Sequence, residues 1–145
     1  MSRPIEARLV LAERIVRRDC LHGTWWPRTT DIQAELALLL AHPRTRTHQV
    51  FGVSLNRNDW PGAPMIVQPA QTRSPKISWY AQHEPHLARL HIHGPARIAL
   101  LLLPPDTPEN VALTAMLMTT TPGNCLGTTQ TLARAYGQVS QAATS

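Results

Sequence analysis

The feature that most constrains the fold is a run of six apolar residues, Ile98 to Leu103, followed directly by two prolines. A short apolar run with no polar face is typical of a strand in the centre of a sheet. It is far too short to cross a bilayer, which takes about 20 residues. A short loop with glycine and proline separates Arg97–Leu103 from a second extended segment, Leu87–His93, so the two are predicted to form an antiparallel hairpin.

Other segments complete the predicted architecture. Further strands are predicted at Ala7–Val16, Gln49–Leu55, Met65–Val67 and Lys76–Ala81, and helices at about Thr30–Pro43, Thr107–Met118 and Thr129–Tyr136. This order predicts an α+β fold, with a mainly antiparallel sheet of about five to six strands and two main helices packed on one face. Residues 1–137 would form a single domain, and residues 138–145 a flexible tail.

Local signals set the expected helix ends. Thr30 and Gln33 have the spacing of a capping box, and Pro43 is expected to end that helix. Its apolar residues Ile32, Leu36, Leu39 and Leu40 share one face. Thr107 is the expected N-cap of the next helix, with Pro108 at its first position.

Composition bounds the class of protein. The 145 residues are 43% hydrophobic and 16% charged, which is typical of a folded domain. The net charge of +5 comes from scattered arginines with no basic run, so nucleic-acid binding is not indicated but stays open. Cys20 and Cys125 are expected to be free thiols, and Met1–Arg8 lacks the apolar stretch of a signal peptide. We therefore expect a cytoplasmic protein with no membrane association.

The segment from His22 to Leu36, which contains Trp-Trp-Pro-Arg, resembles a family of small actinobacterial proteins known only as a domain of unknown function. The family pattern is D-G-x-W-W-P-R-[ST]-x-D-L-x-x-E-L, followed by a later L-x-V-P-P-[DE]-T that matches Leu101 to Thr107. An early R-L-x-L strand and Trp60-Pro61 also agree in order. His22 stands where the pattern has aspartate, and the resemblance implies no activity.

The Trp25-Trp26-Pro27-Arg28 block allows two interpretations. It lies just before a helix start, where backbone amides, the guanidinium and two indoles could hold an anionic ligand. Alternatively, one indole packs on the helix while Arg28 pairs with Asp31 or Glu35.

Histidines raise a metal hypothesis. Four of them, His83, His86, His91 and His93, fall within eleven residues. On a strand, His91 and His93 would face the same side and are weak metal candidates, although solvent-facing histidines are the expected outcome. Cys20 and His22 could form a nucleophile and base, but no third group is indicated. No cofactor motif occurs, and we expect none to be bound.

Three functions stay open. The first is a non-enzymatic binding or regulatory module, with a protein partner, whose surface includes Trp25, Trp26, Arg28 and Trp60. The second is an enzyme for a small or anionic molecule, with Arg28 stabilising charge and His86 as general base. The third is a weak, charge-driven nucleic-acid binder.

Overall fold

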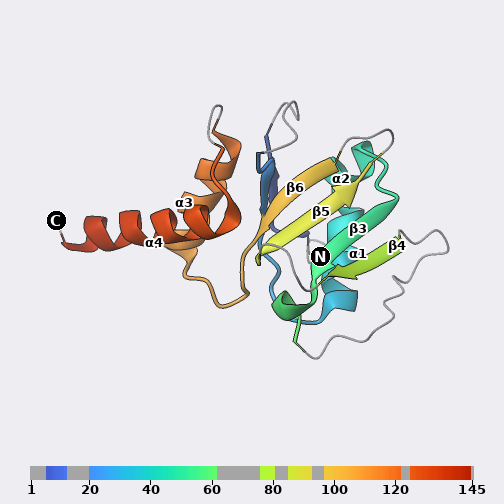
Figure 1. Ribbon diagram of the computed structural model, residues 1–145, viewed down its shortest axis with the longest axis horizontal. Helices are drawn as coiled ribbons and strands as arrows, with labels where there is room; N and C mark the ends of the chain where they lie inside the picture. Colours follow the sequence, from blue (N-terminus) through green and yellow to red (C-terminus); the bar gives the residue numbers. More distant parts are fainter. Residues whose placement is uncertain are drawn as a thin grey trace, which may run out of the picture.

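The computed structural model describes residues 6–12, 20–61, 76–80, 85–92, 97–121 and 125–144. The strands are β1 (Leu9–Leu11), β2 (Gly23–Trp25), β3 (Gly52–Asn56), β4 (Lys76–Tyr80), β5 (Leu87–His91) and β6 (Arg97–Leu102). The helices are α1 (Ile32–Ala41), α2 (Pro43–Thr47), α3 (Glu109–Thr120) and α4 (Thr128–Thr144), with a 3₁₀ turn η1 at Arg57–Asp59 (Figure 1). The strand predicted at Met65–Val67 lies outside the described residues.

The described strands form one sheet of six, in the order β1-β2-β6-β5-β3-β4. Pairing is antiparallel between β1 and β2, β6 and β5, and β5 and β3. It is parallel between β2 and β6 and between β3 and β4. The α+β prediction with a mainly antiparallel sheet is confirmed, and so is the hairpin, in which Leu90 faces Ile98.

The sequence reasoning missed β2, whose three residues are too few to show a period. This strand lies between β1 and β6, so Trp25 pairs with Leu9 on one side and with Leu102 on the other. Because β2 and β5 flank β6, the apolar run is central in the sheet, as predicted.

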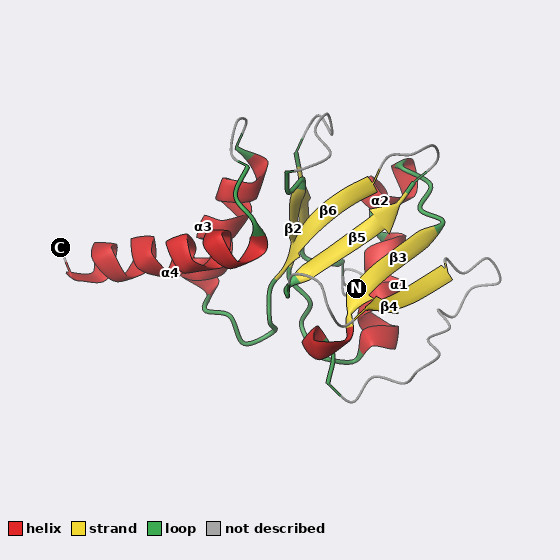
Figure 2. Cartoon of the chain, in the orientation of Figure 1, coloured by secondary structure: helices red, strands yellow, loops and turns green. Residues whose placement is uncertain are grey.

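Helices pack on both faces of the sheet, although α3 and α4 cover only the part of the second face near β1, β2 and the end of β6, so the prediction of helices on one face is wrong. Successive strand residues point to opposite faces. Leu100 and Leu102 belong to the core cluster that contains Ile32 and Leu36 of α1. Leu101 belongs to the second cluster, with Val111, Ala112 and Ala115 of α3 and Ala135 of α4. A strand that is apolar on both faces needs cover on both, and Figure 2 shows α1 behind the sheet and α3 and α4 beside it.

The helix ends differ from the predicted signals. The N-cap of α1 is Asp31, whose side chain accepts a hydrogen bond from Ala34 N, so the Thr30 capping box is wrong. Pro43 ends α1 but also begins α2, where a proline without an amide hydrogen is tolerated. Thr107 is not the cap of α3, because its hydroxyl donates to the carbonyl of Pro104.

Helix α4 is longer than predicted. It continues through Gly137 to Thr144, and its far end projects away from the sheet (Figure 1). The predicted end at Gly137 is therefore wrong, while flexibility of residues 138–145 stays a prediction. Among the described residues, no helix combines the length and the apolar character needed to cross a membrane.

The cysteines form a disulfide, so the prediction of free thiols is wrong. Cys20 precedes β2 and Cys125 precedes α4, and their Cα atoms lie 4.6 Å apart although 105 positions separate them in the chain. A pairing across this separation cannot be deduced from spacing. The bond links the segment before α4 to the segment before β2.

Candidate functional site

A cavity of about 410 Å³ opens at the end of the sheet where β6 finishes. Pro27 and Thr30 form one wall, and Asn58 to Pro61 form another. His86 and the segment from Leu102 to Asp106 complete the lining. This volume is typical of sites for small organic molecules, and a mainly apolar wall with a few polar groups is typical of their composition.

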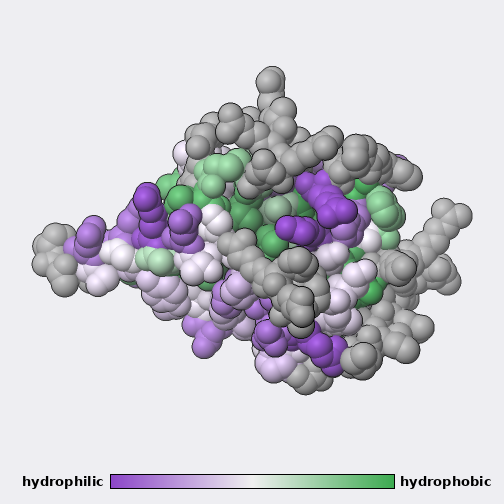
Figure 3. Space-filling model, in the orientation of Figure 1, coloured by the Kyte–Doolittle hydropathy of each residue, from purple (hydrophilic) through white to green (hydrophobic). Residues whose placement is uncertain are grey.

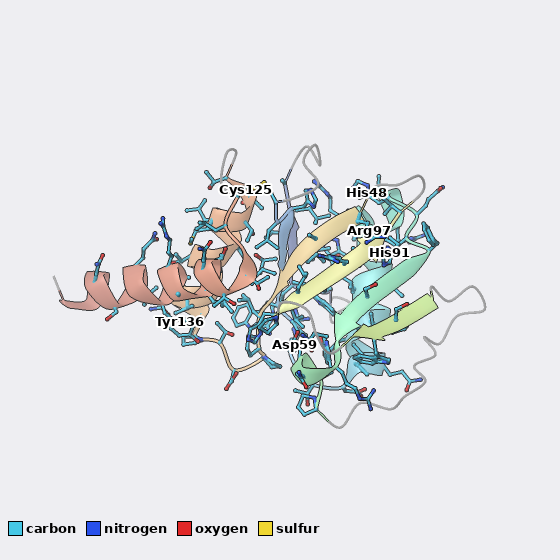
Figure 4. All side chains as sticks on the ribbon, viewed as in Figure 1. His48, Asp59, His91, Arg97, Cys125 and Tyr136 are labelled. Carbon is cyan, nitrogen blue, oxygen red and sulfur yellow. A yellow bond between two sulfur atoms is a disulfide. The ribbon has the colours of Figure 1, made fainter. Side chains whose placement is uncertain are left out.

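Asp59 and His86 form the polar centre of the cavity wall. One Asp59 carboxylate oxygen, Oδ2, accepts a hydrogen bond of 2.9 Å from the His86 amide, and Oδ1 lies 3.6 Å from the His86 Nδ1. The Asp59 side chain is 5% exposed and that of His86 is 34% exposed. Burial raises the pKa of Asp59, and the neighbouring His86 charge opposes that rise. The pair therefore combines a shielded carboxyl with an accessible imidazole (Figure 4 labels Asp59).

The backbone of His86 is held in an unusual conformation. Its φ is 60°, in the left-handed region that L-residues adopt at a cost. Hydrogen bonds from other elements hold this turn. The His86 amide donates to Asp59, and the His86 carbonyl accepts from Leu102 N at 2.8 Å. The Pro85 carbonyl accepts from the Thr128 hydroxyl at 2.7 Å. Strain supported from several elements is a recurrent property of functional positions.

Trp25 and Trp60 lie in the core behind the cavity. Their side chains are 0% and 2% exposed, and their ring centroids are 5.5 Å apart. Both indole nitrogens are buried, and neither has a hydrogen-bond partner within the described part of the chain. Trp60 lines the cavity, whereas Trp25 does not. Buried rings cannot form the exposed recognition surface of the first hypothesis.

Trp26 supports the cavity rim. Its indole nitrogen donates to the Pro104 carbonyl at 3.2 Å, and the Arg8 guanidinium lies 3.7 Å from the ring centroid. Arg8 also donates to the carbonyls of Trp26 and Pro27. The ring is 8% exposed, so its role here is to position the loop.

Arg28 does not face the cavity. Its guanidinium donates to the Glu6 carbonyl at 2.6 Å, and its backbone amide donates to a Glu35 carboxylate oxygen at 3.0 Å. Glu35 also accepts from the Thr29 hydroxyl. The predicted link between Arg28 and Glu35 therefore exists through the backbone. The sequence-based enzyme hypothesis, which places Arg28 beside His86 as a charge stabiliser, loses its geometric basis.

The remaining sequence candidates have structural partners. Cys20 is bonded to Cys125, and the His22 Nδ1 accepts from Ala99 N at 2.9 Å, so these two residues are no nucleophile and base. His91 lies 2.6 Å from the Ser54 hydroxyl through Nε2, while His93 lies outside the described residues. No group of three or more metal-ligating side chains occurs in the part of the chain that the structure describes.

Sequence reasoning missed Asp59. The available signal was its position directly before Trp60 and Pro61, which agree with the family pattern. Its partner His86 is 27 positions away, and no spacing rule links a 3₁₀ turn to a distant loop.

Neither the curated proteins nor the solved structures contain a detectable match to this chain. A family of unknown function matches residues 8–119, which include β1 to β6, α1, α2, all but the last residue of α3 and all lining residues of the cavity. Helix α4 lies beyond the matched segment. Because the match covers well over half of the chain, the resemblance inferred from the Trp-Trp-Pro-Arg segment is confirmed: the chain belongs to the family of unknown function DUF5994.

Proposed function

We propose that this protein is a non-enzymatic binding module for a small organic molecule, held in the cavity beside Asp59 and His86. The observation that carries the proposal is this polar pair set in an otherwise largely apolar wall of a 410 Å³ cavity. A few fixed polar groups orient a ligand, and the apolar wall supplies most of its binding free energy. The protein partner predicted from the sequence would then respond to the ligand-bound state.

The charges of the wall indicate the ligand class. Asp59 and Asp106 contribute carboxyl groups, and no lysine or arginine occurs among the described residues of the lining. A ligand with an apolar body and a hydrogen-bond donor or a positive charge fits this wall. An anionic ligand, which the sequence suggested, would face two carboxyl groups without a basic partner.

The apolar part of the ligand would rest on prolines and Leu102, Leu103 and Trp60. The donor would bond to the accessible imidazole: the Asp59 carboxylate, 3.6 Å from Nδ1, favours a hydrogen on that nitrogen electrostatically, and the neutral ring then offers Nε2 as an acceptor. This electrostatic preference would favour the ring tautomer that receives a donor.

The test is a fragment screen by ligand-observed NMR on the wild-type protein and on a blocked variant. Thr30 is exposed on the cavity rim, so Thr30→Trp would fill the entrance without entering the core. Thr129→Trp is the matched control, because Thr129 is an exposed residue of α4 outside the lining. Fragments with an amine or hydroxyl donor should bind the wild type and the control but not Thr30→Trp. Equal binding to all three proteins, or no binding at millimolar concentration, contradicts the proposal.

We also propose that the protein acts in the cytoplasm, and the disulfide gives a test. Disulfides are rare in a reducing cytoplasm. The Cys20–Cys125 bond therefore removes one argument for a cytoplasmic location, which was the prediction of free thiols. Cells would be quenched with acid and their free thiols alkylated with a mass tag. A cytoplasmic protein should carry two tags without added reductant, whereas a fully oxidised pair would place the protein in an oxidising compartment.

A further inference from the structure

A second polar surface lies on the sheet, on the face that points away from α1. Ser54 of β3, Arg89 and His91 of β5, and Arg97 of β6 alternate with residues of the α1 core, so all four point to this face. Arg97 is exposed, and the other three are half-buried. Hydrophilic side chains gather on this side of the molecule (Figure 3), and Figure 4 shows His91 and Arg97 close together on adjacent strands.

The register fixes how the positive side chains are spaced. His91 is paired directly with Arg97, and Arg89 is paired with Ala99. Arg89 and Arg97 are therefore diagonal neighbours on one face, with Cβ atoms roughly 7 to 8 Å apart. Long guanidinium side chains at this spacing can contact the same extended anion.

Among the described residues, no carboxyl group lies on this surface to balance the positive charges of Arg89 and Arg97. Neither Arg89 nor Arg97 forms an ion pair there, and the described carboxyl groups lie on other elements. Burial lowers the pKa of His91, and the charges of Arg97 and Arg89 lower it further. The imidazole thus experiences a local positive potential, which attracts an anion.

An exposed aromatic ring borders the charged residues. Phe51, which directly precedes β3, is 54% exposed, and its ring centroid lies 6.2 Å from that of His91. Its backbone amide donates to the His91 carbonyl at 2.9 Å, so the Phe51 backbone is fixed to β5 of the sheet. Exposed aromatic rings beside arginines on a strand surface are the elements that bind unstacked bases and phosphates.

We propose that this sheet face, defined by Phe51, Ser54, Arg89, His91 and Arg97, binds a single-stranded nucleic acid. Arg89 and Arg97 contact the phosphates, and Phe51 stacks on a base. A flat strand surface accommodates an extended strand, whereas Watson–Crick pairing hides the bases of a duplex from Phe51. This site shares no residue with the cavity of Asp59 and His86, so each proposal can be refuted without affecting the other.

The test is fluorescence anisotropy of a short labelled oligothymidylate with the full chain. Arg89→Gln and Arg97→Gln should each weaken binding severalfold and reduce the slope of log affinity against log salt by about one. Arg134→Gln is the matched control, because it removes an exposed arginine of α4, away from the sheet face, and should leave the affinity within twofold. Phe51→Leu should weaken binding about fivefold or more without changing the salt slope.

Three outcomes would overturn the proposal. The first is no binding at low salt, and the second is an equal loss for Arg134→Gln and Arg97→Gln, which would indicate general charge attraction. The third is equal competition by poly-glutamate at the same charge concentration, which would identify an acidic protein as the partner. Circular dichroism of each variant shows whether the sheet is intact. The conservative Arg97→Lys should retain most of the affinity, because it keeps the positive charge that contacts the phosphates.

Discussion

Trp25 and Trp26 are neighbours in the chain, yet they belong to different cores. Trp25 is fully buried in the cluster between the sheet and α1, with Leu36, Val53 and Leu100. Trp26 is 8% exposed and packs with the cluster of α3 and α4. The alternation of an extended backbone directs two identical residues to opposite faces.

The two cores are held together differently. The α1 side consists of large side chains with almost no exposure, such as Trp25, Leu39 and Leu55. The α3 and α4 side has small residues such as Ala112, a buried hydrogen bond of 2.7 Å between Thr24 and Thr119, and the disulfide. Where apolar area is scarce, polar and covalent links contribute more of the stability.

The sharpest test of this comparison is the pair Trp25→Ala and Trp26→Ala. Trp25→Ala should lower the free energy of unfolding by about 3 to 5 kcal/mol, because it leaves a large cavity in a tightly packed core. Trp26→Ala should cost less, since Trp26 is less completely buried and belongs to the smaller cluster. Urea denaturation of both variants measures the difference, and a larger loss for Trp26→Ala would reverse our assignment of the main core.

Reduction of the disulfide is expected to have the next largest effect. The bond closes a loop of about a hundred residues, and its loss should lower the free energy of unfolding by roughly 2 to 4 kcal/mol. Hydrogen exchange with and without dithiothreitol should show faster exchange mainly in α3 and α4. Exchange that rises equally in α1 would mean that the two sides unfold as one unit.

The threonine pair gives a smaller and more local effect. Thr119→Val removes the partner of the fully buried Thr24 hydroxyl and should cost about 1 to 3 kcal/mol. The double variant Thr24→Val with Thr119→Val leaves no hydroxyl unpaired and should be more stable than Thr119→Val alone. Thermal unfolding of the wild type, both single variants and the double variant completes the cycle, and additive losses would refute a specific pair.

The smallest expected effect lies in α4, outside the segment matched to the family. A Cβ added at Gly137 meets no atom within 4 Å, so Gly137→Ala should stabilise the helix by about 0.5 to 1 kcal/mol. The measurements are helical circular dichroism and melting temperature. An unchanged signal would support the frayed tail that the sequence predicted from residue 138.

Particular residues show how far the sequence could be interpreted. The alternation around Val53 was enough to predict β3, and the run ending at Leu103, with the glycine–proline loop before it, was enough to predict the hairpin of β5 and β6. The candidate site was predicted only in part: Trp60 and His86 line the cavity, but Asp59 was missed and Arg28 points elsewhere. The strand β2 was missed because three residues carry no periodic signal, and their extended conformation depends on β1 and β6 at both sides.

By itself, the sequence determined the longer strands and the main helices and that the apolar run from Ile98 lies in the centre of a sheet, because hydrophobic spacing is a local property of the chain. Only the tertiary structure decided that α3 and α4 cover the second face, that Cys20 meets Cys125, and that Asp59 lies against His86. These pairings join residues far apart in the chain. Their partners are chosen by the packing of whole elements, which no local pattern records.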